Sequence, residues 1–160
     1  MKTFKDKAGR NWTISINIAA AKRLRDQMSV DLLQPEVGDP PLLTRLGTDE
    51  ILLGEVLCCL LSDQFEAHGI GEEDVLAAFD GDTLLAAQTA FYEDLADFFR
   101  GRGRTDRAKA VARQAEMIAA TVARVAKKID EIDIDEVIDG VFGIDGTFGK
   151  KSGDSPALSE

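Results

Sequence analysis

The sequence predicts a mainly α-helical protein with a small N-terminal β-hairpin, a helical bundle and a long C-terminal helix that carries a heptad pattern. Three observations support this fold class: an alternating apolar run early in the chain, amphipathic runs of helical period after it, and a regular 3-4 spacing of apolar residues near the end. We expect a single domain over residues 1–140, with the hairpin at 2–16 and the helical body at 17–140. A flexible tail containing Gly and Ser is expected at 141–160.

The hairpin is indicated by alternation on both sides of a short turn. In Trp12–Ile16 every second residue is apolar, so one face of the strand should be buried and the other exposed. Gly9 supplies the positive φ that a tight connection needs. Because two strands alone are marginally stable in water, the hairpin must lie against helices or pair with another strand. Phe4 and Trp12 are the side chains expected to dock it, and both are candidate partner-binding residues.

The first helices are predicted from caps and breakers. Asn17 is a good N-cap for a helix over 18–28, and Pro and Gly residues interrupt the chain over 30–47, where leucines should hold a loop in place. Thr48 is expected to cap a helix that runs to about Ala67. That helix is apolar around most of its circumference, which predicts a central position in the fold.

Two further helices follow in the acidic middle of the chain. A short helix with an acidic first turn is predicted from Glu72 through Ala78. Asp80 or Asp82 is expected to cap a longer helix that ends near Arg100, before the glycines of the next break.

The last helix carries the most regular pattern in the chain. Its apolar residues repeat in a 3-4-3-4 spacing, which is a heptad seam. The seam consists of Ala108, Val111, Ala115, Ile118, Val122, Val125, Ile129 and Ile132. It can pack inside the domain or against another copy, so a homo-oligomer through the seam stays open. Val111, Ala115, Ile118, Val122, Val125 and Ile129 are the candidate partner-binding residues of this helix.

Charge is distributed in blocks of alternating sign around a formal total of −10. Residues 31–99 carry 16 acidic and 1 basic side chains, whereas residues 100–128 carry 9 basic and 2 acidic ones. A nucleic-acid-binding surface would have to compete with these acidic segments, so no nucleic-acid partner is expected. The blocks fit pairing within or between subunits, or simply the solvated faces of separate helices.

No membrane partner is expected either. The chain has no run approaching the roughly 20 apolar residues that a membrane-spanning helix needs. The charged start at Met1–Asp6 has no apolar stretch behind it that would make a signal peptide. These features predict a cytoplasmic protein.

No residue set points to catalysis, to a cofactor or to a metal. Cys58 and Cys59 are adjacent in an apolar helix, which disfavours a disulfide between them and indicates small core residues. His68, before a glycine at a helix end, is better read as part of a C-terminal cap than as a base. The acidic run 130–146 fails the spacing of a calcium-binding EF-hand in both registers that its glycines allow. We therefore expect no enzymatic activity.

A cluster of arginines lies at the break before the last predicted helix. Gly101-Arg102-Gly103-Arg104 lies between Arg100 and Arg107, as in an arginine-rich RNA-binding element, but no aromatic residue is interleaved for base stacking. These arginines are expected to contact acidic groups, within the chain or on a partner.

The N-terminal third resembles a group of phage and prophage proteins. The resemblance is carried by Phe4-x-Asp6-x-x-Gly9-Arg10-x-Trp12-x-x-x-Ile16-Asn17, then by Lys22-Arg23-Leu24-Arg25 and Val30-Asp31-Leu32-Leu33, and less closely by the Phe-rich stretch Phe91–Arg100. Proteins of this group are encoded among tail genes and resemble the tail assembly chaperones of long-tailed phages.

The resemblance implies a non-enzymatic, mostly helical protein that binds other proteins. Such chaperones coat the tape measure protein, keep it soluble and help to recruit tail tube subunits, so these two are the implied partners. They are often made in two lengths by a ribosomal frameshift, for which Lys150-Lys151 offers a suitable codon pair. Two alternatives stay open: a structural component of the phage tail or connector, and a small regulatory domain that dimerises.

Overall fold

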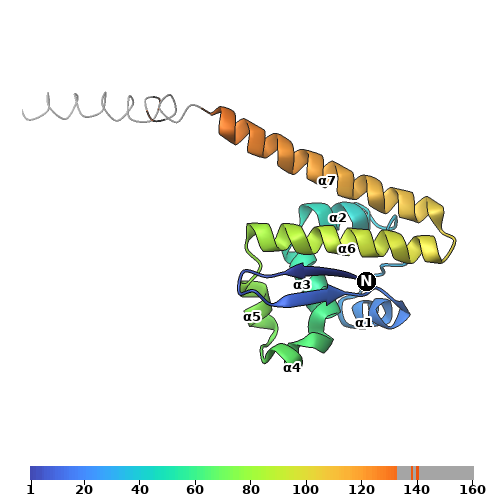
Figure 1. Cartoon of the computed structure of the whole chain (residues 1–160). Helices are drawn as coiled ribbons and strands as arrows, with labels where there is room; N and C mark the ends of the chain where they lie inside the picture. Colours follow the sequence, from blue (N-terminus) through green and yellow to red (C-terminus); the bar gives the residue numbers. More distant parts are fainter. Residues whose placement is uncertain (133–137, 139, 141–160) are drawn as a thin grey trace, which may run out of the picture. The chain divides into compact units, whose positions relative to one another are not determined.

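The computed structural model describes residues 1–132, 138 and 140. The chain divides into two units, Met1–Ile118 and Ala119–Glu160. The elements are β1 (Lys2–Lys5), β2 (Asn11–Ile14), α1 (Ile18–Met28), α2 (Leu42–Thr48), α3 (Glu50–Leu61), the 3-10 turn η1 (Ser62–Gln64), α4 (Phe65–His68), α5 (Glu72–Ala77), α6 (Gly81–Gly101) and α7 (Thr105–Glu131). The predicted fold class is thus confirmed: a mainly helical, bundle-like protein with an N-terminal hairpin and a long C-terminal helix (Figure 1). The single-domain range 1–140 stays a prediction, and the tail 141–160 lies outside the described residues.

The hairpin has the predicted register and turn. β1 and β2 are antiparallel, with Phe4 opposite Trp12, and Gly9 has a φ of +82° in the turn. One buried carboxylate organises this turn: Asp6 accepts hydrogen bonds from the backbone N–H groups of Ala8 and Arg10 at 2.9 and 3.0 Å. It also accepts from Arg10 Nε at 2.8 Å and from Trp12 Nε1 at 3.0 Å. A single side chain therefore satisfies four donors and links the turn to the core.

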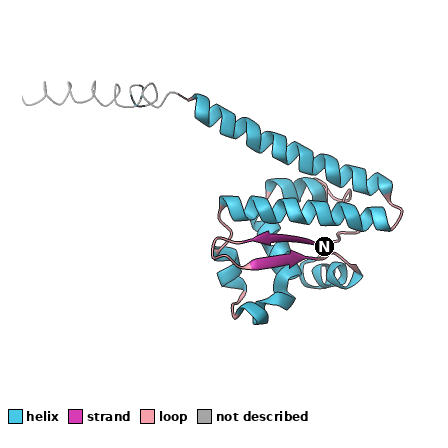
Figure 2. Ribbon diagram, in the orientation of Figure 1, coloured by secondary structure: helices cyan, strands magenta, loops and turns pink. Residues whose placement is uncertain are grey.

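The hairpin lies against helices, as a two-stranded sheet requires. β1 runs beside α6, and β2 contacts both α6 and α3 (Figure 2). Asp94 of α6, which is buried, accepts a hydrogen bond from Ile16 N at 2.6 Å just after β2. On the other side, the Gln64 amide bonds both backbone groups of Thr13, at 2.9 Å to its N–H and 2.7 Å to its carbonyl. Side chains from the helical body thus supply the hydrogen bonds that a third strand would make.

α1 begins and joins the body as its sequence predicts. Asn17 caps it by accepting from Ala20 N at 2.9 Å, and Ala20, Ala21 and Leu24 form its buried face. Arg23 on the opposite edge donates to the carbonyl of Cys59 at 3.1 Å, at the end of α3. This bond ties the first helix to the central one.

The region from 30 to 67 differs from the prediction in three places. Part of the expected loop is a helix, α2, whose Leu42, Leu43 and Leu46 are buried. The cap of α3 is Asp49, which accepts from Leu52 N at 3.0 Å, whereas Thr48 bonds back to the carbonyl of Thr44 inside α2. A helix that was expected to reach about Ala67 ends at Leu61 and continues as η1 and α4. The long-range bonds of Gln64 to Thr13 fix this bend.

The acidic helices follow the prediction closely. α5 spans six residues after Gly71, and α6 is capped by Asp80, which accepts from Thr83 N at 2.9 Å. This decides between the two aspartates that the sequence left open. α6 contributes Phe91, Tyr92, Leu95 and Phe99 to a core that α3 fills from the other side with its buried leucines and with Cys58 and Cys59.

Candidate partner-binding surface

The heptad seam of α7 starts inside the core. Ala108 and Val111 are 3% and 0% exposed, and Ala115 and Ile118 are partly buried against the same apolar cluster. α2 approaches this part of α7 closely at Gly47, where an added Cβ would lie 2.6 Å from Gln114 Nε2 and 3.3 Å from Ile118 Cδ1. A larger residue at this position would require the ends of the Gln114 and Ile118 side chains to shift. The first half of the seam therefore belongs to the fold.

Arg107 fixes the start of α7 to the rest of the first unit. It donates to the carbonyl of Leu33, forms an ion pair with Glu36 at 2.6 Å and lies over the Phe99 ring at 5.9 Å. Its neighbours Arg100 and Arg104 pair with Asp97 and Asp106. The expectation that the arginines of this cluster contact acidic groups is thus confirmed within the chain for Arg100, Arg104 and Arg107. Arg102 instead lies over the Phe98 ring, 5.4 Å from its centroid.

The second half of the seam is exposed. Val122, Val125 and Ile129 are 42%, 52% and 61% exposed, and Ile132 is 49% exposed. The alanines that lie between these four residues in the sequence add no polar side chain to the apolar stripe. The basic residues of this segment are Arg124, Lys127 and Lys128. We call residues 119–132 the exposed seam. Clustered apolar residues at the surface of a protein indicate an interaction site.

The hairpin residues of the candidate set have a different environment. Phe4 and Trp12 are 7% and 1% exposed, and Trp12 packs edge-on against Phe65 and lies 4.3 Å from the His68 ring. Phe4 contacts Phe79 at 6.3 Å between ring centroids. Both side chains dock the hairpin onto the helices. Partner binding by them stays a prediction.

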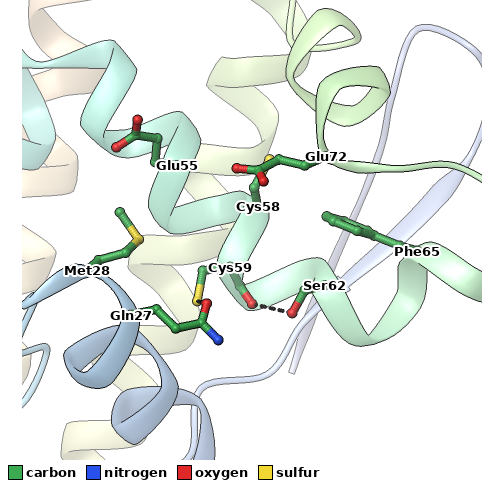
Figure 3. A pocket seen from close by; sticks show the side chains of 8 residues that line it. All are labelled: Gln27, Met28, Glu55, Cys58, Cys59, Ser62, Phe65 and Glu72. Carbon is green, nitrogen blue, oxygen red and sulfur yellow. Dashed lines mark hydrogen bonds between the residues drawn. The ribbon is translucent and has the colours of Figure 1, made fainter.

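A small pocket contains the two cysteines. It has a volume of about 270 Å³ and lies between α1, α3 and α5, with Gln27, Cys58, Cys59 and Glu72 in its wall (Figure 3). Burial, with the Glu72 carboxylate nearby, raises the pKa of the Cys58 thiol to about 12, so this thiol is protonated and a poor nucleophile at neutral pH. Cys59 Sγ contacts Gln27 Oε1 at 3.5 Å. Both cysteines are free and buried, which confirms them as core residues.

The only histidine, His68, is the last residue of α4 and contacts the hairpin. Its Nε2 lies 3.0 Å from the carbonyl oxygen of Asn11, and Gly69 ends the helix with a φ of +66°. Among the residues that the structure describes, no three His, Cys, Asp or Glu side chains converge as a metal site. The acidic run considered for calcium falls mainly outside these residues.

The sequence did not point to a second apolar surface, which lies between α3, α5 and the start of α6. Ile51, Gly54, Leu76, Phe79 and Leu84 form a groove of about 330 Å³, and Glu50 and Glu55 lie at its edge. Ile51 is 76% exposed although its helix is central to the fold. The sequence signal that could have indicated it is the lack of Lys and Arg between Arg45 and Arg100.

No protein-family model matches this chain, and neither a curated protein nor a solved structure is significantly similar to it. Within the described residues, none of the helices combines the length and the apolar character needed to cross a membrane.

Proposed function

We propose that this protein is a non-enzymatic tail assembly chaperone of a long-tailed phage or prophage, which binds the tape measure protein in the host cytoplasm and keeps it soluble. The observation that supports this proposal is the exposed half of a heptad seam whose other half is buried in the fold. Val122, Val125 and Ile129 continue the spacing of Ala108 and Val111 but stay exposed.

The exposed seam suits a helical partner. Apolar residues at a 3-4 spacing present side chains that interlock with a facing helix of the same period. Tape measure proteins are long helices, as the resemblance implies, and so offer many such faces. The tail tube subunit is the second partner in this proposal, because it must join the tape measure protein during assembly.

Co-expression tests the proposal. The longest predicted helical protein encoded beside this chain is expressed with and without it, and its soluble fraction and co-purification are measured. We expect the partner to become soluble and bound, and Val122→Asp with Val125→Asp to reduce the bound amount at least about tenfold, because two charges would be buried against the partner helix. Val37→Asp is the matched control, since Val37 is 53% exposed in the loop before α2.

The outcomes separate this function from its alternatives. Failure of the partner to bind at any salt concentration, with the protein folded, contradicts the chaperone. A structural tail component would appear in purified particles in fixed copy number, whereas a chaperone should be absent from them. Loss of binding in Val37→Asp but not in the seam variant would place the binding surface elsewhere.

A further inference from the structure

The groove between α3, α5 and α6 has two carboxylates among its otherwise apolar lining residues. These carboxylates belong to Glu50 and Glu55, and no Lys or Arg is among the residues that line the groove. Within the described part of the chain, neither of these two carboxylates forms an ion pair. The groove is therefore complementary to an apolar segment that carries positive charge.

The same chain contains such a segment. Residues 119–129 of α7 carry Arg124, Lys127 and Lys128 and no acidic residue, next to the exposed Val122, Val125 and Ile129. Lys127 lies 3.9 Å from Glu131, a weak exposed pair that leaves its charge largely available. Residues 119–129 thus combine apolar side chains that fit the apolar lining of the groove with the positive charge that the groove lacks, and Asp130 and Glu131 follow them in the exposed seam.

We propose that the exposed seam of one copy docks in the acidic groove of a second copy. Val125 and Ile129 would cover Ile51 and Leu76, and Arg124 and Lys128 would face Glu50 and Glu55. Each copy would contribute two different surfaces, so the contact is heterologous and can form a ring or a longer chain of subunits. This inference does not rest on the proposed function. If both hold, a helical partner competes with the neighbouring copy for the same face of α7.

Mixing two variants of the full chain, each unable to self-associate, tests the docking of seam into groove. Ile51→Glu disables the groove, and Val125→Glu disables the seam. Ile51 lies in the first turn of α3, where an added carboxylate is favourable for the helix, so the fold should be kept. Circular dichroism confirms this, and Val37→Glu serves as an exposed control on neither surface.

In sedimentation velocity at low salt, the unaltered chain and Val37→Glu should gain average mass with concentration, whereas each groove or seam variant alone should stay monomeric. An equimolar mixture of Ile51→Glu and Val125→Glu should form a complex of two chains and no larger one. High salt should weaken association by about tenfold, because the contact is charge-assisted and exposed to solvent.

Two results would overturn the inference. The unaltered chain could remain a monomer at all concentrations and salt conditions. Alternatively, Val125→Glu could abolish association while Ile51→Glu does not, with no recovery in the mixture, which would indicate symmetric pairing of two α7 helices. Neither result changes the outcome expected from the co-expression experiment. Failure of the self-association proposal is therefore distinguishable from failure of the proposed function.

Discussion

Val111→Asp is expected to lower the melting temperature of the protein by more than about 10 °C, whereas Val125→Asp should leave it within about 2 °C. Val111 is 0% exposed, so an aspartate there would place an unpaired charge in the apolar core at a cost of about 3–5 kcal/mol. For a domain of this size the melting temperature falls by about 4 °C per kcal/mol of lost stability, so this cost corresponds to a decrease of more than about 10 °C. Val125 is 52% exposed, and surface changes of this kind stay near 0.5 kcal/mol.

Thermal unfolding followed by circular dichroism measures both variants, which carry the same substitution in the same helix. The comparison separates the structural half of the seam from the half available for binding. Equal destabilisation by the two variants would mean that the exposed seam is also part of the folded core, and would remove the basis of both proposals.

Asp6→Ala is expected to destabilise the protein by about 3 kcal/mol at pH 7. The substitution removes the acceptor of four donors and leaves the indole N–H of Trp12 buried without a partner. Asp26→Ala is the matched control, since it removes an exposed i,i+4 pair with Lys22 and should leave the free energy of unfolding nearly unchanged. Urea unfolding at constant temperature measures the two differences.

The same carboxylate predicts a pH dependence. Burial alone would raise the pKa of Asp6, but the hydrogen bonds from Trp12 and Arg10 outweigh it and lower this pKa to about 2 from 3.8. A lowered folded-state pKa means that its stabilisation is present above pH 3.8 and is lost as the pH falls towards 2. The shift corresponds to about 2 kcal/mol. The stability difference between the unaltered protein and Asp6→Ala should therefore shrink by that amount between pH 5 and pH 2. A constant difference over this range would contradict the assigned role of the charge.

Local signals predicted most of the fold. Alternation in Trp12–Ile16 and the left-handed position of Gly9 define the hairpin, and the side chains of Asn17 and Asp80 cap the helices that follow them. The caps join residues three positions apart, and the hairpin joins residues no more than 12 positions apart, so the sequence carries these features directly. α2 was missed because Pro40, Pro41 and Gly47 suggest a loop, whereas its three leucines form a buried helical face.

Long-range contacts explain what the sequence could not predict. The end of α3 is fixed by Gln64 bonding Thr13, residues that lie 51 positions apart. The seam has the same period in both halves, so periodicity alone could not indicate that burial ends after Ile118. From the sequence, Ile51 could not be distinguished from the buried apolar residues of its helix. Its position in the groove depends on where α5 and α6 pack. Which surface is left exposed depends on the whole fold, and the candidate site is defined by that exposure.

Hydrogen exchange at residues 119–132 tests most directly the claim that the exposed seam binds a helical partner. In the dilute isolated chain the amides of 119–132 should exchange faster than those near Val111, because Val122, Val125 and Ile129 are exposed whereas Val111 is buried in the core. In the complex purified by co-expression, exchange over 119–132 should slow at least about tenfold. Unchanged exchange over 119–132, with new protection elsewhere on the chain, would contradict the claim.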